Sequence, residues 1–175
     1  MKEIIEIPEE VNAKMDGFNL EIESGGDKVV KKFNSDRVEV TVSDGSIKVE
    51  SIKNGKKSNA VVGTYRSHIK NMLEGVQEGY TYKLKTVYAH FPMNVKVSGN
   101  KVVIQNFIGE RAPRNVKIPE GVSVNVDDDE VTVEGADKEK VSQTAANIEQ
   151  ECHKGSRDPR VFQDGIYVVK NGGAS

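Results

Sequence analysis

The chain has 175 residues, 36% of them apolar and 30% charged, which is typical of a globular protein and argues against a disordered one. Its 25 basic and 27 acidic residues leave a net charge of −2, so any attraction to nucleic acid must come from local basic patches. There is no signal-peptide pattern, no segment approaches the roughly 18 apolar residues of a membrane span, and the single Cys152 excludes an internal disulfide, so we expect a cytoplasmic protein.

The first half of the chain has the alternation of apolar and polar residues that is typical of strands. Strands are indicated at Phe18–Ile22 and Val29–Phe33. Apolar residues then recur at every second position over 38–42 and 47–49, which predicts an antiparallel hairpin with one buried face. The pair Asp44-Gly45 between them tolerates the positive φ that a tight hairpin turn requires.

A helical pattern follows this hairpin. The spacing of apolar residues predicts a helix over about Asn59 to Leu73, and the segment Glu74–Gly79 is expected to close the first half of the chain. The residues that share the apolar face of this helix are Val62, Tyr65, Ile69, Met72 and Leu73.

The second half repeats this order of elements. A strand is predicted over Tyr80–His90, and further strands at Val95–Val97 and Val102–Phe107. A second hairpin turns at the acidic run Asp127–Glu130. A second helix is predicted from about Asp137, whose side chain suits an N-cap, to Cys152.

The two halves are related by an internal repeat. The stretches VEVTVSDGSIKVE and VSVNVDDDEVTVE begin 84 residues apart, and the same offset relates Val11 to Val95, each near a matching proline. The repeat predicts an α+β fold of two tandem duplicated domains, residues 1–80 and 81–175. Each would be a small antiparallel sheet of three or four strands with one packed helix. The tail over residues 153–175 has no counterpart in the first copy.

No constellation of residues for catalysis stands out, so we expect neither an enzyme nor a cofactor. The histidines lie far apart in the sequence, and Cys152 lies on the apolar helix face, which favours a buried hydrophobe over a nucleophile. The motifs CxxC and HExxH and the phosphate-binding glycine motifs do not occur. The run Asp127–Glu130 lacks the spacing and central Gly of a calcium loop, so a solvated turn is favoured and no metal is expected.

Two basic segments remain as candidates for nucleic-acid binding. One is IGERAPRNVKIP, interpreted as a loop between strands, and the other is the tail segment HKGSRDPRVFQDGIYV with its aromatic residues. Arg forks suit phosphate oxygens, and aromatic rings can stack on exposed bases, although ordinary solvated loops remain the alternative on composition alone. The candidate residues are Arg111, Arg114, Lys117, Lys154, Arg157, Arg160, Phe162 and Tyr167.

Five segments of the chain carry a family likeness. They are GTYRSHIKNMLEGVQEGY, YAHFPM, QNFIGERAPR, QTAANIEQ and DPRVFQDGIYV, at residues 63–80, 88–93, 105–114, 143–150 and 158–168. In this order and spacing they closely resemble the large-subunit ribosomal protein L-six family in its archaeal and eukaryal form. The resemblance covers nearly the whole chain and implies two related α+β domains with a structural role in the ribosome.

The resemblance also implies partners. They are large-subunit rRNA near the sarcin-ricin loop and the stalk base, neighbouring large-subunit ribosomal proteins, and translation factors nearby, with neither membrane nor DNA. In that family the second domain and the tail provide most rRNA contacts. Position by position, the resemblance favours Arg111 and Arg114 in the loop and Lys154, Arg157, Arg160 and Tyr167 in the tail. A protein-interaction scaffold outside the ribosome, with exposed strands as docking edges, is the alternative that the acidic balance supports.

Overall fold

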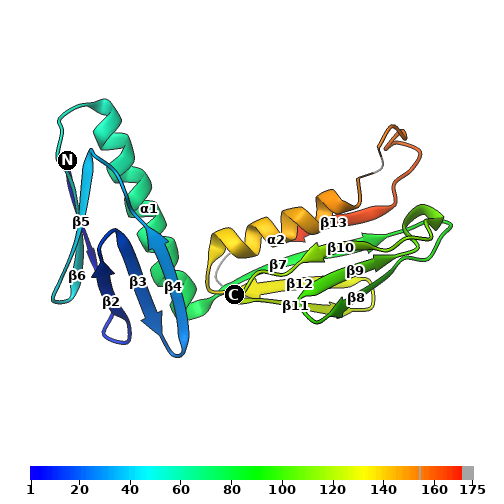
Figure 1. The fold of residues 1–175 in the computed structure, drawn as a ribbon. Helices are drawn as coiled ribbons and strands as arrows, with labels where there is room; N and C mark the ends of the chain where they lie inside the picture. The colour runs from blue at the N-terminus through cyan, green and yellow to red at the C-terminus, as the bar shows by residue number, and fades with distance from the viewer. Residues whose placement is uncertain (154, 171–175) are drawn as a thin grey trace. The chain divides into compact units, whose positions relative to one another are not determined.

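The computed structural model describes residues 1–153 and 155–170, and the chain divides into two compact units (Figure 1). The first unit comprises residues 1–79, and the second begins at residue 80. In the described part of the chain, helices are too short or too polar to cross a membrane.

The first unit consists of two three-stranded antiparallel sheets and one helix. One sheet has the strand order β1-β6-β5 and the other β2-β3-β4, and helix α1 contacts strands of both. The elements are β1 (Lys2–Glu6), β2 (Asn12–Asp16), β3 (Asn19–Ser24), β4 (Asp27–Lys32), β5 (Val38–Ser43), β6 (Ser46–Ser51) and α1 (Lys56–Glu78).

The second unit repeats this plan with one additional strand. Its sheets have the orders β11-β12-β7-β13 and β10-β9-β8, and helix α2 contacts strands of both. The elements are β7 (Tyr80–Val87), β8 (Asn94–Ser98), β9 (Lys101–Gln105), the short 3-10 helix η1 (Phe107–Gly109), β10 (Arg114–Lys117), β11 (Val122–Asp127), β12 (Glu130–Gly135), α2 (Lys138–Glu151) and β13 (Gly165–Lys170).

The matching strand orders confirm the α+β fold of duplicated units. The offset of 84 is confirmed for the hairpins, since β5 and β6 correspond to β11 and β12. It is wrong for the strands before them. Ala13 pairs with Ile22 as Val95 pairs with Ile104, so Val95 corresponds to Ala13 and not to Val11. A gapless offset fails there because the loops between strands differ in length.

Each unit contains more strands than the three or four that the sequence predicted. In the described residues the first unit has β1 to β6 and the second β7 to β13. The short strands β1 and β2, KEIIE and NAKMD, do not alternate cleanly between apolar and polar residues, because each lies at the edge of its sheet and leaves much of its surface to solvent.

Helix α1 is longer than predicted and includes Glu74 to Glu78 of the segment that was expected to close the first half, and the first unit ends at Gly79. The helix continues past Leu73 because Gly75 and Val76 are buried. It ends at Gly79, whose positive φ of 75° is a backbone conformation that glycine adopts readily.

Helix α2 begins where the sequence predicted. The side chain of Asp137 accepts hydrogen bonds from the backbone N–H groups of Glu139, at 3.0 Å, and Lys140, at 3.5 Å. Its buried face consists of Val141, Thr144, Ala145 and Ile148. Burial of this face against β7 and β12 fixes the position of the helix end from which the tail departs.

Removal of this cap is expected to weaken the second unit measurably. In Asp137→Ala two backbone donors of the first helical turn lose their acceptor, so the free energy of unfolding should fall by about 1 kcal/mol in urea denaturation. Asp137→Asn retains the acceptor and should stay within a few tenths of a kcal/mol, about the difference between good N-caps. An equal loss in both variants would show that the hydrogen bonds do not carry the effect.

The tail contributes a strand that the sequence pattern did not reveal. Strand β13 pairs with β7 in antiparallel register, with Ile166 opposite Thr86 and Val168 opposite Leu84. Ile166 is fully buried in the core of the second unit. Residues 165–170 of the tail are therefore part of the sheet.

Candidate nucleic-acid interface

A strained loop connects β9 to β10. Its residues Asn106, Ile108 and Gly109 all have left-handed φ values, of 59°, 53° and 75°. A β-branched residue rarely adopts this conformation, so Ile108 must be held there by its surroundings, and such outliers are typical of functional loops. The side-chain amide of Asn106 donates to the carbonyl of Pro92, at 3.0 Å, and the ring of Phe91 lies against Gly109. The loop is thus fixed to the segment before β8.

Arg114 connects this loop to the end of α2. Its guanidinium binds both carboxylate oxygens of Glu110, at 2.8 and 2.7 Å, and donates to the carbonyls of Glu151 and, at 3.2 Å, His153. It also lies over the ring of Phe107, 4.6 Å from the ring centre. The hydrogen bonds from Arg114 hold the pKa of the Glu110 carboxyl below its usual value, and those to Glu110 raise the pKa of Arg114.

The loop before β13 is organised around Asp158. Its carboxylate accepts from the backbone N–H and the guanidinium of Arg160, at 2.9, 3.2 and 3.2 Å, and its carbonyl accepts from the N–H of Phe162, at 2.9 Å. The guanidinium of Arg157 lies 5.3 Å from the centre of the Phe162 ring. The hydroxyl of Tyr167 donates to the carbonyl of Gln163, at 2.9 Å. Turn geometry therefore presents Arg157 and Arg160 to solvent.

The two loops lie at the same end of the second unit, around the last turn of α2 (Figure 1). Arg157 is close enough to Glu110 that its charge, after the larger effect of Arg114, contributes to the lowered pKa of that carboxyl. Arg111 is exposed on the loop between β9 and β10. Arginines from two separate parts of the sequence therefore contribute positive charge to one end of the unit.

Lys117 does not join this group. It lies at the other end of β10, opposite Lys101 in the sheet register. Arg114 and Lys117 also belong to a strand rather than to the loop that the sequence indicated, because the segment RNVK pairs with β9. Lys154 lies outside the described residues.

An aromatic group beside the loop between β9 and β10 was not predicted as part of the site. Tyr88 and Phe91 are 47% and 40% exposed, and His90 packs edge-on against Phe91 with ring centres 4.7 Å apart. The sequence signal was the run YAHFP, three aromatic rings in a segment that ends with proline. Exposed rings beside arginines offer stacking surfaces for unpaired bases.

Among the described residues at this end of the unit, the one thiol is buried and no metal-binding cluster is found. Burial raises the pKa of the Cys152 thiol to about 11, so the thiol stays protonated at neutral pH and is a poor nucleophile. No cluster of histidine, cysteine and carboxylate side chains in the described ranges could hold a metal ion.

Comparisons with known proteins give one consistent result. The family model described as Ribosomal protein L6 matches residues 7–79 and 91–165, one segment in each unit. Among curated proteins, the chain is 47% identical to the large ribosomal subunit protein uL6 of Methanococcus vannielii, over 99% of this chain and 95% of that protein. It is 48% identical to the uL6 of Methanosphaera stadtmanae, over 95% and 91% of the two chains, and 46% identical to that of Halobacterium salinarum, over 95% and 93%.

Proposed function

We propose that the second unit of this chain binds large-subunit rRNA near the sarcin-ricin loop and the stalk base. The chain belongs to the ribosomal protein L6 family and is thus a structural protein of the large ribosomal subunit rather than an enzyme. In the cytoplasmic ribosome it supports the region where translation factors dock, beside neighbouring large-subunit proteins. The observation that carries this proposal is the convergence of exposed arginines from two loops at one end of a rigid sheet.

The proposed contacts divide into two kinds. Arg111, Arg157 and Arg160 are exposed and bind phosphates, while Phe162 supports Arg157 from below and offers a stacking surface. The remaining candidates are assigned as follows: Arg114 and Tyr167 position the two loops through their hydrogen bonds within the protein, Lys117 makes a separate contact at the other end of β10, and Lys154 is retained from the sequence alone.

The mechanism is electrostatic and geometric. Each arginine that neutralises a phosphate releases a condensed counterion, which supplies affinity without reading sequence. Specificity comes from the fixed spacing of the two loops, which matches only RNA of the right shape. The net charge of −2 makes this local arrangement the source of the attraction.

The proposal predicts a change in salt dependence. Replacement of Arg157 and Arg160 together by alanine should flatten the slope of log K against log salt by about 1.5 to 2, for binding to an rRNA fragment that contains the sarcin-ricin loop. Arg37→Ala with Lys53→Ala is the matched control, since it removes two exposed cations from the first unit and should leave the slope unchanged. An unaltered slope in the first variant would place the contact surface elsewhere.

A further inference from the structure

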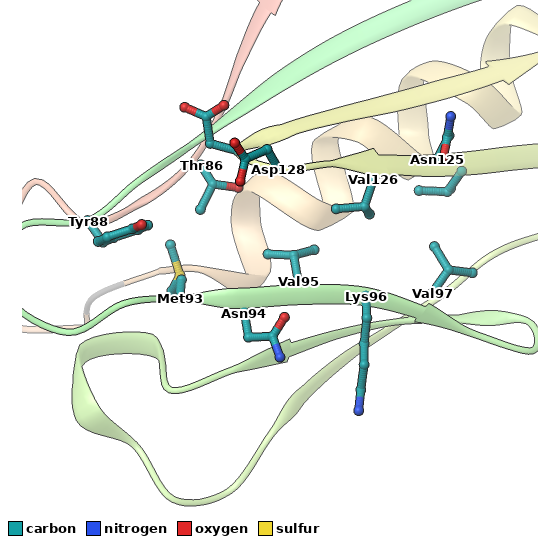
Figure 2. A pocket seen from close by; sticks show the side chains of 12 residues that line it. Thr86, Tyr88, Met93, Asn94, Val95, Lys96, Val97, Asn125, Val126 and Asp128 are labelled. Carbon is teal, nitrogen blue, oxygen red and sulfur yellow. The ribbon is translucent and has the colours of Figure 1, made fainter.

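A groove opens in the second unit between strands β8 and β11, at the face where its two sheets meet (Figure 2). It encloses about 520 Å³. Val95 and Val97 of β8 point across it toward Val126 of β11, while Lys96 points away (Figure 2). These three valines form an apolar strip in a groove whose exposed lining is otherwise mainly polar, and Thr86, Asp128 and Asp129 belong to that polar lining.

The hydroxyl of Thr86 is a buried polar group without a partner. The residue is 6% exposed, and its Oγ1 has no hydrogen-bond partner among the described residues, although its backbone N–H donates to the carbonyl of Asp129, at 2.7 Å. A buried hydroxyl without a hydrogen bond destabilises the folded state, so its presence requires an explanation, and a ligand bound in the adjoining groove would be one.

The first unit shows that the fold does not require this hydroxyl. There the backbone N–H of Ile7 donates to the carbonyl of Gly45, at 2.9 Å, and Gly45 corresponds to Asp129 in the repeat. Ile7 therefore occupies the position of Thr86. The two positions are occupied by Ile7 and Gly45 in the first unit, and by Thr86 and Asp129 in the second. The fold therefore requires neither the hydroxyl nor the carboxylate at these positions.

The walls of the groove are edges of sheets. In the described part of the chain, β8 and β11 are each the outermost strand of their sheet and contact one another, so each has one row of backbone groups that no strand of this chain pairs with. Such an edge can accept an added strand from another chain. Val97 is 40% exposed, which leaves apolar surface for the side chains of that strand.

We propose that this groove binds an extended basic segment of a protein partner. The backbone of that segment pairs with an edge strand, and the aliphatic stem of an arginine or lysine lies along the valines. The cationic head lies between the carboxylates of Asp128 and Asp129 and donates a hydrogen bond to Thr86 Oγ1. This interface goes beyond the proposed rRNA contacts, because it engages a protein and uses other residues.

Charge favours a basic protein segment over RNA as the occupant. The turn Asp127–Glu130 places four carboxylates in sequence beside the groove, and these repel phosphates and attract cations. The groove also adjoins the proposed rRNA interface, since Tyr88 and Met93 of its lining belong to the segment that holds the loop between β9 and β10. A basic segment there would neutralise the turn next to bound RNA.

Titration of the isotope-labelled full chain followed by NMR tests the proposal. The probe is a capped peptide of three Arg-Val repeats, and the reference peptide has Glu in place of each Arg. Backbone signals of β8, β11 and Thr86 should shift and saturate with the first peptide and stay in place with the second. Shifts confined to other surfaces, or produced at β8 and β11 only by an rRNA oligonucleotide, would overturn the proposal.

Variants separate this role from a structural one. Thr86→Val and Asp128→Asn should each raise the Kd of the Arg-Val peptide about tenfold, the effect of losing one charge-assisted hydrogen bond. Thr86→Val should at the same time shift the urea midpoint upward, because it removes the unpartnered hydroxyl. Asp44→Asn, the corresponding change in the first unit, should leave peptide affinity unchanged. Unaltered affinity in Thr86→Val, or an equal loss in Asp44→Asn, would contradict the assignment.

Discussion

Replacement of Gly135 by alanine is expected to lower the free energy of unfolding of the second unit by roughly 2–3 kcal/mol. A Cβ at this position would lie 2.8 Å from the carbonyl oxygen of Gly121 and 2.8 Å from Cγ2 of Val141. The first is backbone next to the start of β11, and the second belongs to the buried face of α2, so relief of the clash would have to shift a strand end or the helix. Because the chain has no Trp and four of its five Tyr lie in the second unit, tyrosine fluorescence during urea denaturation reports mainly on this unit.

Gly63→Ala provides the matched control. Gly63 lies inside α1, and a Cβ there would meet nothing within 4 Å. Alanine should therefore stabilise the first unit by roughly 0.5–1 kcal/mol through its higher helix propensity. If Gly135→Ala proved neutral, the packing of α2 against β12 would have to be looser than the structure indicates.

Arg114→Ala is expected to lower the free energy of unfolding of the second unit by about 2–3 kcal/mol. Two carbonyls and a carboxylate lose their common donor in this variant, and hydrogen bonds to charged groups are stronger than those between neutral groups. Because the side chain of Arg114 is 24% exposed, this loss of stability is smaller than for a fully buried ion pair. Urea denaturation measures the loss, and the affinity for the rRNA fragment should fall as well, because both basic loops lose their common anchor. Arg114→Lys keeps the charge but not the planar fork, and should recover only part of the stability.

The pH dependence distinguishes the ion pair from the carbonyl contacts. The folded-state pKa of Glu110 is lowered, so its contribution is present above the unfolded-state value near 4.5 and is lost as pH falls through the lower folded-state pKa. The stability difference between the wild type and Arg114→Ala should therefore shrink in acid but not vanish, because the carbonyl bonds persist. A difference that does not change with pH would assign the whole effect to the carbonyls.

The sequence predicted the parts of the fold whose signal is local. The hairpins have an uninterrupted alternation of Val and polar residues, and Asp137 begins α2 as its side-chain chemistry indicates. The edge strands β1 and β2 were not predicted, because half-exposed strands tolerate both apolar and polar residues on their outer face. Strand β13 was not predicted, because its partner β7 lies far away in the sequence.

For the candidate site, the sequence predicted which types of residue take part but not how they are arranged in space. That Arg114 and Arg157 both act near Glu110 follows from the positions of α2 and β13, which no local pattern encodes. Arg114 was identified by its charge, but it donates to the backbone carbonyl of Glu151, 37 residues away. Because every residue has a backbone carbonyl, the sequence does not reveal which of them accepts this hydrogen bond. The left-handed Ile108 has no sequence signature at all, since β-branched residues normally disfavour that conformation.

Strand β13 also has a consequence for the order in which the protein is made. Residues 165–170 are translated after all other elements of the second unit, yet they cover one edge of β7, a strand at the centre of its sheet. A nascent chain that has reached only α2 therefore carries an open sheet edge, which can pair with strands of other chains. The first unit is complete once α1 has formed, so the two halves, alike in fold, differ in how long they remain vulnerable to aggregation during synthesis.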